Sequence, residues 1–187
     1  MLNSTDEQLI ELINDRNTKA LKVLYDRYNV GIFNFILRYT NNRELAEDVL
    51  QETFTRVWFA SHTFMPSRGA LKAWLFTISL NITRNEMSKK QYSYTYVDVE
   101  EVYNENIEEE EFVDPNYLLE ETETKERIYK AIERLNPYLR EVLLLKHFNG
   151  LKFREIAEMT NTPEGTLKAR FHNAISKLKE ILVKAEC

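Results

Sequence analysis

The sequence contains few of the residues that interrupt helices, with only 4 glycines and 4 prolines among its 187 residues. Such a composition favours long helices over a turn-rich β fold. The single cysteine, Cys187, has no partner for an internal disulfide or a cysteine metal site. No stretch approaches the roughly 18 apolar residues of a membrane span, and the first residues lack the basic leader of a secretory signal. We therefore expect a cytoplasmic protein that does not insert into membranes and uses no metal or other cofactor.

The acidic charge of the chain is concentrated in one segment. Hydrophobic residues make up 43% of the sequence, enough for packed cores, and the net charge is -5. Residues 1–90 carry 12 basic and 10 acidic side chains, net +2, and residues 126–187 carry 12 and 8, net +4. Residues 91–125 carry 1 and 12, net -11. Two mildly basic blocks therefore flank one strongly acidic segment.

The acidic segment lacks a sustained apolar period and contains a like-charge run at 108–111. Runs that repel themselves are usually extended linkers or tails, so residues 91–126 are interpreted as a flexible tether between two domains. Two alternatives remain. The stretch YSYTYV alternates like a short strand, and the carboxylates could bind Mg²⁺ or Ca²⁺. A lone strand has nothing to pair with, however, and the run contains no Asp-x-Asp-x-Asp-Gly loop.

The first 90 residues have the three- and four-residue apolar spacing of four helices. Ser4 and Glu7 have the spacing of a capping box ahead of a short first helix. Longer helices are expected over roughly 18–40 and 42–60, followed by a loop at 64–69. The fourth helix then carries the apolar residues Leu71, Trp74, Leu75, Ile78 and Ile82.

Two polar surfaces accompany these helices. The 42–60 helix has an acidic-polar stripe opposite its apolar positions, and a solvated face is the simplest interpretation of that stripe alone. The fourth helix and the loop before it combine basic residues with aromatic ones. Aromatic residues at helical spacing are most often core, but exposed rings beside cations stack on unpaired bases, and an asparagine such as Asn81 can hydrogen-bond a base edge. The stripe comprises Glu44, Glu47, Asp48, Gln51, Glu52 and Thr55; the basic surface comprises Arg68, Lys72, Asn81, Arg84, Lys89 and Lys90.

The C-terminal block has the layout of a helix-turn-helix. Asn136-Pro137 and Asn149-Gly150 delimit a helix over roughly 137–148, and a short helix follows over 152–159. The last helix begins at Pro163, with Thr162 as its N-cap. A short helix, a turn of three or four residues and a longer helix fit this motif, although a helical hairpin with a solvated basic face would show the same spacing.

The start of the last helix carries the candidate DNA-reading residues. Its apolar positions, which include Leu167 and Phe171, recur at steps of four and three, so the opposite side is exposed. Side chains near the start of a recognition helix reach base edges and phosphates in the major groove. The candidates are Thr166, Lys168, Ala169, Arg170, His172 and Asn173.

Taken together, three segments resemble the extracytoplasmic-function (ECF) subfamily of the sigma-70 factors, which are bacterial transcription initiation factors. These segments are AEDVLQETFTRVW, ALKAWLFTISLNITRNEMSKK and LNPYLREVLLLKHFNGLKFREIAEMTNTPEGTLKARFHNAISKLKEIL. The resemblance covers about residues 16–90 and 127–184. It implies an all-α fold of two small helical domains, sigma region 2 in residues 1–90 and sigma region 4 in residues 127–187, joined by the acidic linker 91–126.

The resemblance also implies roles for the polar surfaces. In the family, a D-x-x-Q-E-x-F helix binds the clamp coiled coil of the polymerase large subunit, which assigns polymerase binding to Asp48, Gln51, Glu52 and Thr55, with Phe54 packed inside. The basic surface around Asn81 would read and melt the −10 element, and the last helix would read the −35 element. Relatives often have Ser or Arg at the positions of Ala169, His172 and Asn173, so the −35 sequence cannot be copied from them.

The predicted protein is therefore a promoter-specificity subunit and not an enzyme. Its partners would be RNA polymerase core, promoter DNA and an anti-sigma factor, which could be membrane-anchored. Two other functions remain as alternatives. A free-standing helix-turn-helix regulator would explain only the C-terminal block, and a metal-dependent nuclease would need ligand geometry at residues 108–111 that the sequence does not show.

Overall fold

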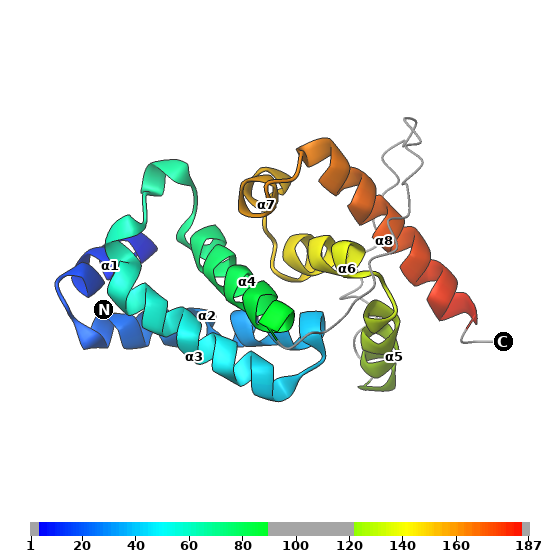
Figure 1. Ribbon diagram of the computed structural model, residues 1–187, viewed down its shortest axis with the longest axis horizontal. Coiled ribbons are helices and arrows are strands. Elements are labelled where there is room, and N and C mark those ends of the chain that lie inside the picture. Colours follow the sequence, from blue (N-terminus) through cyan, green and yellow to red (C-terminus); the bar gives the residue numbers. More distant parts are fainter. Residues whose placement is uncertain (1–3, 90–121, 185–187) are drawn as a thin grey trace.

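The computed structural model describes residues 4–89 and 122–184, and every regular element in these two ranges is a helix. This confirms the predicted all-α fold. Figure 1 shows the helices in two groups that lie side by side, with the N-terminal group at one end and the C-terminal group at the other. The acidic run at 108–111 and the YSYTYV stretch lie outside the described residues. The N-terminal group consists of α1 (Asp6–Asn14), α2 (Thr18–Thr40), α3 (Arg43–Ala60), α4 (Leu71–Lys89) and the short 3₁₀ turns η1 (Ser61–Thr63) and η2 (Pro66–Arg68).

The N-terminal group is a helical bundle built around α2. This helix packs against α1, α3 and α4, and aromatic side chains fill the centre of the bundle. Phe35 and Phe76 are each 1% exposed, and their ring centroids lie 5.5 Å apart in an edge-to-face arrangement. The ranges predicted from apolar spacing, 18–40 and 42–60, agree with α2 and α3 to within a residue. The spacing succeeds here because the apolar stripe of each helix does become its buried face.

The capping box predicted at the first helix is wrong by one residue. Thr5, not Ser4, caps α1, and the Thr5 hydroxyl and Gln8 side chain complete the reciprocal pair. Asp6 is drawn instead to α2, where it accepts hydrogen bonds from the side chains of Arg27 and Tyr28. Two overlapping capping patterns exist in the sequence, and the tertiary contacts of Asp6 select between them.

The beginning of α2 provides a measurable stability term. The side chain of Asn17 accepts hydrogen bonds from the backbone N–H groups of Lys19 and Ala20, at 3.0 and 3.2 Å. Replacing Asn17 by alanine is expected to lower the free energy of unfolding by about 1 kcal/mol, because two N–H groups lose their acceptor. Urea unfolding followed by circular dichroism measures this change. The matched control is Asn14→Ala at the exposed end of α1, expected to change stability by less than about 0.5 kcal/mol; equal losses in both variants would contradict the capping role.

The C-terminal group contains α5 (Thr122–Glu133), α6 (Pro137–Leu143), the π-helical turn η4 (Leu144–Phe148), α7 (Phe153–Thr160) and α8 (Glu164–Lys184). Asn136 caps α6 as predicted, and its side chain accepts a hydrogen bond from the N–H of Leu139. The predicted 137–148 helix is wider in its last turn, where it becomes η4 before Gly150 reverses the chain with φ of 65°. The start of α5 lies inside the tether predicted over 91–126.

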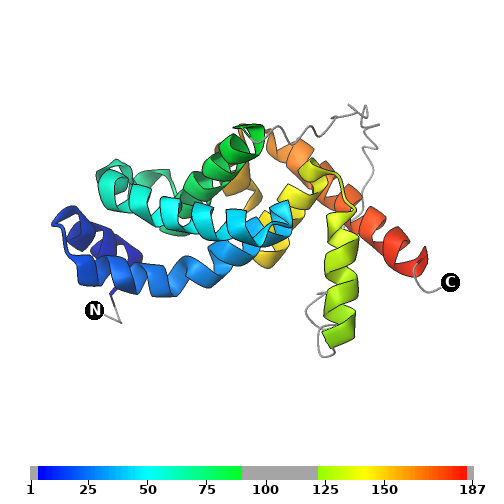
Figure 2. The ribbon, with the colours of Figure 1, turned by 60° about the horizontal axis from the view of Figure 1, so that its bottom comes forward.

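The two groups pack directly against each other. Helix α2 contacts α5, α6 and η4, and α4 contacts α7. Figure 2 shows the same arrangement from a second direction, with α5 projecting away from the N-terminal bundle and α8 along the outer side. Gly31 of α2 lies at this contact, where a Cβ would meet the side-chain oxygen of Asn149 at 3.8 Å. A glycine at this position therefore lets the backbone of α2 lie close to the C-terminal group.

Candidate functional site

The acidic-polar stripe predicted on α3 is a surface of the folded chain. Asp48, Gln51 and Thr55 are exposed on one side of the helix, and Glu52 is half-buried. Glu52 also pairs with Arg56 one turn later, at 2.8 Å. The neighbouring phenylalanine, Phe54, is only 6% exposed, so it packs inside as expected. The stripe therefore presents carboxylate, amide and hydroxyl groups together to a partner.

An apolar groove borders this stripe, and sequence reasoning did not identify it. The groove lies between α2 and α3 and has a volume of about 680 Å³. Phe59 is 64% exposed beside it and Tyr25 is 38% exposed, with the Tyr25 ring 4.8 Å from that of Phe54. Exposed aromatic rings beside polar groups are typical of protein-binding surfaces. The groove is lined by Thr18, Leu21, Tyr25, Glu47, Leu50, Gln51, Phe54, Thr55, Trp58 and Phe59.

The predicted −10 surface is centred on α4 and the loop before it. Asn81 is exposed on α4 and lines a hollow of about 360 Å³ together with Trp74, Arg56 and Thr63. The Trp74 ring also packs on Phe64, with centroids 5.6 Å apart, which holds the loop against α4. Asn81 therefore lies at the rim of a cavity that polar and aromatic groups share.

The basic residues of this surface are less uniform than the sequence suggested. Lys72 is half-buried, and Arg84 is turned toward the C-terminal group. Arg68 and Lys89 lie in η2 and at the end of α4, but their side chains fall outside the described set, as does the whole of Lys90. Of the six predicted residues, Lys72, Asn81 and Arg84 are thus placed on α4, whereas the side-chain positions of the other three remain predictions.

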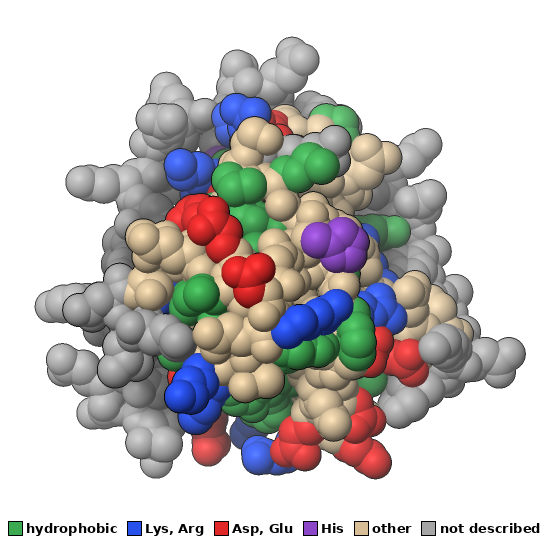
Figure 3. Space-filling model, turned by 90° about the vertical axis from the view of Figure 1, so that its left-hand side faces the viewer, with side chains coloured by type: hydrophobic (Ala, Val, Ile, Leu, Met, Phe, Trp, Pro, Cys, Tyr) green, Lys and Arg blue, Asp and Glu red, His purple; other side chains and the backbone are tan. Residues whose placement is uncertain are grey.

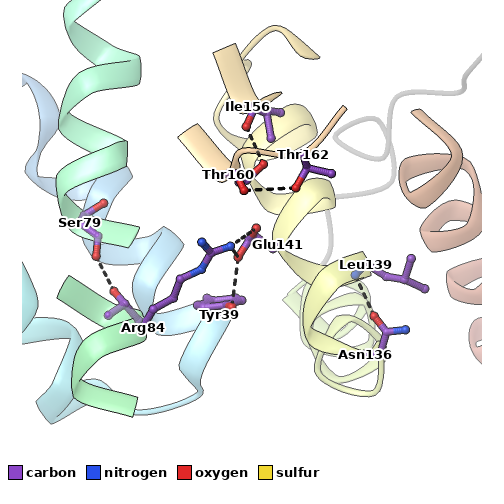
Figure 4. A network of polar contacts seen from close by, with 10 residues as sticks. Tyr39, Ser79, Arg84, Asn136, Leu139, Glu141, Ile156, Thr160 and Thr162 are labelled. Carbon is purple, nitrogen blue, oxygen red and sulfur yellow. Dashed lines mark hydrogen bonds and ion pairs between the residues drawn. The ribbon is translucent and has the colours of Figure 1, made fainter. Parts of the chain in front are cut away.

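Arg84 forms a charge pair with the other half of the chain. Its Nη2 donates to both carboxylate oxygens of Glu141, each at 2.8 Å, and the hydroxyl of Tyr39 donates to the same carboxylate at 3.2 Å (Figure 4). Burial alone would lower the pKa of Arg84, but the charge and hydrogen bonds of Glu141 outweigh burial and raise the pKa above its usual value. Arg84 is therefore a cation that already has a carboxylate partner.

The predicted −35 surface is formed by the first half of α8. Lys168, His172 and Asn173 are exposed, whereas Thr166 and Ala169 are partly covered. Leu167 and Ala174, on the opposite side, are buried at 2% and 0% exposure. The amphipathic register read from the sequence therefore agrees with the structure. It leaves a polar side of α8 directed away from the protein.

Arg170 departs from this pattern. It is partly buried, and its guanidinium carbon lies 4.7 Å from the centroid of the Tyr138 ring on α6. The Nε atom of Arg170 is enclosed by protein, so this end of the side chain does not face outward. A cation over an aromatic ring stabilises the packing of α8 on α6. The sequence placed Arg170 with the DNA-reading residues because it could not show that Tyr138 lies beneath it.

A tight turn holds α7 and α8 in their relative orientation. Asn161 adopts a left-handed conformation with φ of 51° at the end of α7, and α8 begins at Glu164, one residue after the predicted start. The rings of Phe153 and Phe171 pack edge to face across the two helices, with centroids 5.8 Å apart. A short helix, a tight turn and a longer helix with an exposed polar face constitute a helix-turn-helix.

The remaining surfaces show no comparable concentration of one charge. On the end of the molecule drawn in Figure 3, acidic and basic side chains are interspersed with uncharged and apolar ones. No helix in residues 4–89 or 122–184 is long and apolar enough to cross a membrane. The polar side of α3, the surface of α4 and the outer side of α8 are therefore the features that distinguish this fold.

The fold and these surfaces define a DNA-binding protein with a helix-turn-helix and a separate helical bundle. Residues 24–92 match the family described as Sigma-70 region 2, and residues 125–178 match Sigma-70, region 4. The chain belongs to the sigma-70 family of RNA polymerase sigma factors, and within it to the ECF subfamily that directs polymerase to promoters.

Curated relatives share this organisation along their whole length. The ECF RNA polymerase sigma-E factor of Escherichia coli (strain K12) is 28% identical over 174 residues, which cover 91% of this chain and 90% of that protein. The RNA polymerase sigma-H factor of Pseudomonas aeruginosa is 27% identical over 187 residues, covering 95% and 93%. The order of the two regions is therefore preserved across nearly the entire chain.

Two solved structures are similar in fold. CnrH, in complex with the cytosolic domain of CnrY, superimposes with a TM-score of 0.69 at 24% identity, covering 97% of this chain and 99% of that chain. The sigma factor RpoE from Bartonella quintana, in complex with the anti-sigma factor NepR, superimposes with a TM-score of 0.65 at 25% identity, covering 88% and 97%. The likeness extends over both helical groups.

Proposed function

We propose that the chain binds RNA polymerase core through α3 and reads two promoter elements, one with α4 and one with α8. The observation that carries this proposal is the presence of three exposed polar surfaces on one chain, in the order that sigma regions 2 and 4 require. A protein that only bound an operator would need the helix-turn-helix alone. The three surfaces together favour a subunit that connects polymerase to DNA.

The polymerase contact is assigned to Asp48, Gln51, Glu52 and Thr55. Three of these residues are exposed, and they border the apolar groove that contains Phe59. Hydrophobic anchors surrounded by polar groups are typical of tight protein interfaces. In this proposal the clamp coiled coil of the polymerase large subunit lies along α3, with the groove supplying apolar contact area beside the polar stripe.

The −10 contact is assigned to Asn81 and the cations around it, Arg68, Lys72, Arg84, Lys89 and Lys90. Extruding a base from duplex DNA costs a few kcal/mol, and hydrogen bonds and stacking in a pocket offset that cost. Asn81 lies at the rim of a hollow that also contains an indole ring, which suits a single unpaired base. The cations would hold the phosphates of the displaced strand.

The −35 contact is assigned to the outer side of α8, from Thr166 to Asn173. Lys168 would bind a phosphate or guanine, and His172 and Asn173 would hydrogen-bond base edges in the major groove. Ala169 is small enough to let α8 approach the groove or a thymine methyl group. Arg170 contributes by holding α8 on α6 through Tyr138, and not by reading bases directly.

The remaining assignments follow from the same function. We take residues 1–90 as region 2, residues 91–126 as a linker and residues 127–187 as region 4. The protein is proposed to act in the cytoplasm without catalytic activity of its own, since polymerisation belongs to its partner. RpoE of Bartonella quintana forms a complex with an anti-sigma factor. We propose a partner of this class here as well, and whether that partner is membrane-anchored is a separate question.

Transcription in vitro tests the proposal. Core polymerase from the bacterium that encodes the chain is incubated with a library of genomic fragments, with and without the purified protein. The expected result is transcripts that start at defined positions and depend on the added protein. A stand-alone regulator would instead bind particular fragments without polymerase and leave transcription by core unchanged. A library that yields no transcripts above those of core alone would contradict the proposal.

A further inference from the structure

The contact between the two helical groups depends on a carboxylate of the C-terminal group. Glu141 belongs to α6, and its side chain is only 7% exposed. The three hydrogen bonds described above join it to Arg84 of α4 and Tyr39 of α2, both in the N-terminal group (Figure 4). A charged group is seldom buried unless it is paired. The burial of Glu141 is therefore tied to the presence of the other group.

Further polar contacts cross the same boundary. Arg140 donates a hydrogen bond to the backbone carbonyl of Tyr39 at 2.9 Å, and Arg38 donates to the hydroxyl of Tyr129 at 2.6 Å. The guanidinium of Arg38 also lies 4.9 Å from the centroid of the Phe148 ring. Interfaces rich in polar and charged groups can separate at modest cost, because each group regains water when the surfaces part. The boundary thus has the character of a reversible contact.

Helix α7 covers part of the proposed −10 surface in this arrangement. A hollow of about 400 Å³ lies at the loop before α4, and its other wall comes from Glu155, Glu158 and Met159 of α7. Trp74 and Thr77 of α4 line the same hollow. Two carboxylates beside this loop would repel the phosphates of a DNA strand. The acidic wall is therefore unfavourable for strand binding at the place where α4 would receive it.

The other two proposed surfaces remain open in the same arrangement. The main contacts of α3 are with α2, α4 and η1, and those of α8 are with α5, α6 and α7. Asp48 and Gln51 on α3 and Lys168 and Asn173 on α8 are all exposed. The packing of the two groups thus covers the −10 surface selectively.

We infer that this packed arrangement is an autoinhibited state of the free factor, in which Glu141 occupies on Arg84 the place that a DNA phosphate would take. The inference rests on the proposed role of α4 in binding the −10 strand. Both groups belong to one chain, so their contact forms without a second molecule and competes with DNA at any protein concentration. A single strand reaches α4 only in molecules whose groups have separated. The apparent affinity for that strand is then reduced by the fraction of molecules that are open.

The experiment compares two acid-to-arginine variants of the full-length chain. Glu141→Arg places a second cation against Arg84 and is expected to separate the groups. Glu133→Arg makes the same charge change at an exposed position of α5 and is the matched control. Spin labels on Lys22→Cys and Lys179→Cys, in a Cys187→Ser background, report the distance between α2 and α8 by pulsed electron paramagnetic resonance. We expect a longer and broader distance distribution for Glu141→Arg, and an unchanged one for Glu133→Arg.

Strand binding is measured on the same proteins with a fluorescein-labelled single-stranded 12-mer of randomised sequence. Glu141→Arg is expected to bind about tenfold more tightly than Glu133→Arg, because separation exposes α4 in addition to the shared change in charge. The isosteric variant Glu141→Gln, which adds no cation, should change both readouts in the same direction by a smaller amount. Equal binding by the two arginine variants, or an unchanged distance in Glu141→Arg, would overturn the inference. These measurements use neither polymerase nor promoter, so their outcome is separate from the transcription test of the proposed function.

Discussion

Replacing Asp48 by arginine is expected to weaken binding to core polymerase by about 30-fold, which corresponds to about 2 kcal/mol. Asp48 is exposed at the centre of the polar stripe on α3, one turn from Gln51 and Glu52. Reversing its charge replaces an attraction across the interface by a repulsion, and such like-charge contacts cost several kcal/mol when they are desolvated. Fluorescence anisotropy of the labelled chain, titrated with core, measures the dissociation constant directly.

The control for this prediction is Glu11→Arg. Glu11 is also an exposed acidic residue on a helix of the N-terminal group, but it belongs to α1 and lies outside the stripe and its groove. The two variants have the same net charge, so a difference between them cannot come from long-range electrostatics alone. Equal affinities for core in the two variants would contradict the assignment of α3.

Replacing Asn173 by alanine is expected to weaken discrimination at one base pair of the −35 element by about 1–3 kcal/mol, roughly 5- to 150-fold. Asn173 is exposed in the half of α8 where a recognition helix contacts bases. Lys168→Ala should instead lower affinity for all sequences alike and reduce the salt dependence of binding by about one counterion. Competition between point-mutated duplex fragments, with the wild-type or variant holoenzyme, measures both quantities.

Lys184→Ala is the matched control for the change in charge on α8. Lys184 is exposed at the end of the same helix, about 24 Å from Lys168 at 1.5 Å per residue. It should leave the base preferences of the holoenzyme unchanged. If Asn173→Ala altered affinity without altering preference at any base pair, Asn173 would be a phosphate contact and the assignment of base reading would be wrong.

Periodicity in the sequence predicted most of the fold. The helices expected over 18–40, 42–60 and 152–159 are present within a residue or so, because each has a continuous apolar stripe that becomes its buried face. The end of the 137–148 helix was less accessible, since a π-helical turn satisfies the same hydrogen-bonding groups as an α-helix and leaves no distinct sequence pattern. The start of α5 was also missed, because it lies in an acidic stretch where charge outweighed periodicity.

The site was predicted less completely, because exposure depends on contacts between distant segments. Arg170 has the sequence position of a DNA-reading residue, but Tyr138 covers it. Arg84 has the position of a strand-binding cation, but it pairs with Glu141, 57 residues away. Phe59 appeared to be one more aromatic residue of an amphipathic helix until α2 and α3 together formed the groove. Each difference comes from tertiary packing that local patterns do not encode.

The distribution of charge fits a factor that binds DNA weakly by itself. The strongly acidic segment 91–125 lies between the two regions that would read DNA, and each of those regions carries only a small net positive charge. Few cations imply weak duplex binding that falls steeply with salt. Polymerase would supply the remaining affinity by holding both reading surfaces at one promoter, so that the second contact forms within the complex.

The most direct test of the central claim is to map the 5′ ends of transcripts made in vitro by core polymerase with the wild-type chain. If α4 and α8 read two elements together, the start sites will share two sequence motifs upstream, near −10 and −35, with a nearly constant spacing. Asn173→Ala holoenzyme should lose preference only in the upstream motif, which links that motif to α8. Start sites that share no motif, or transcripts that do not depend on the added chain, would contradict the account.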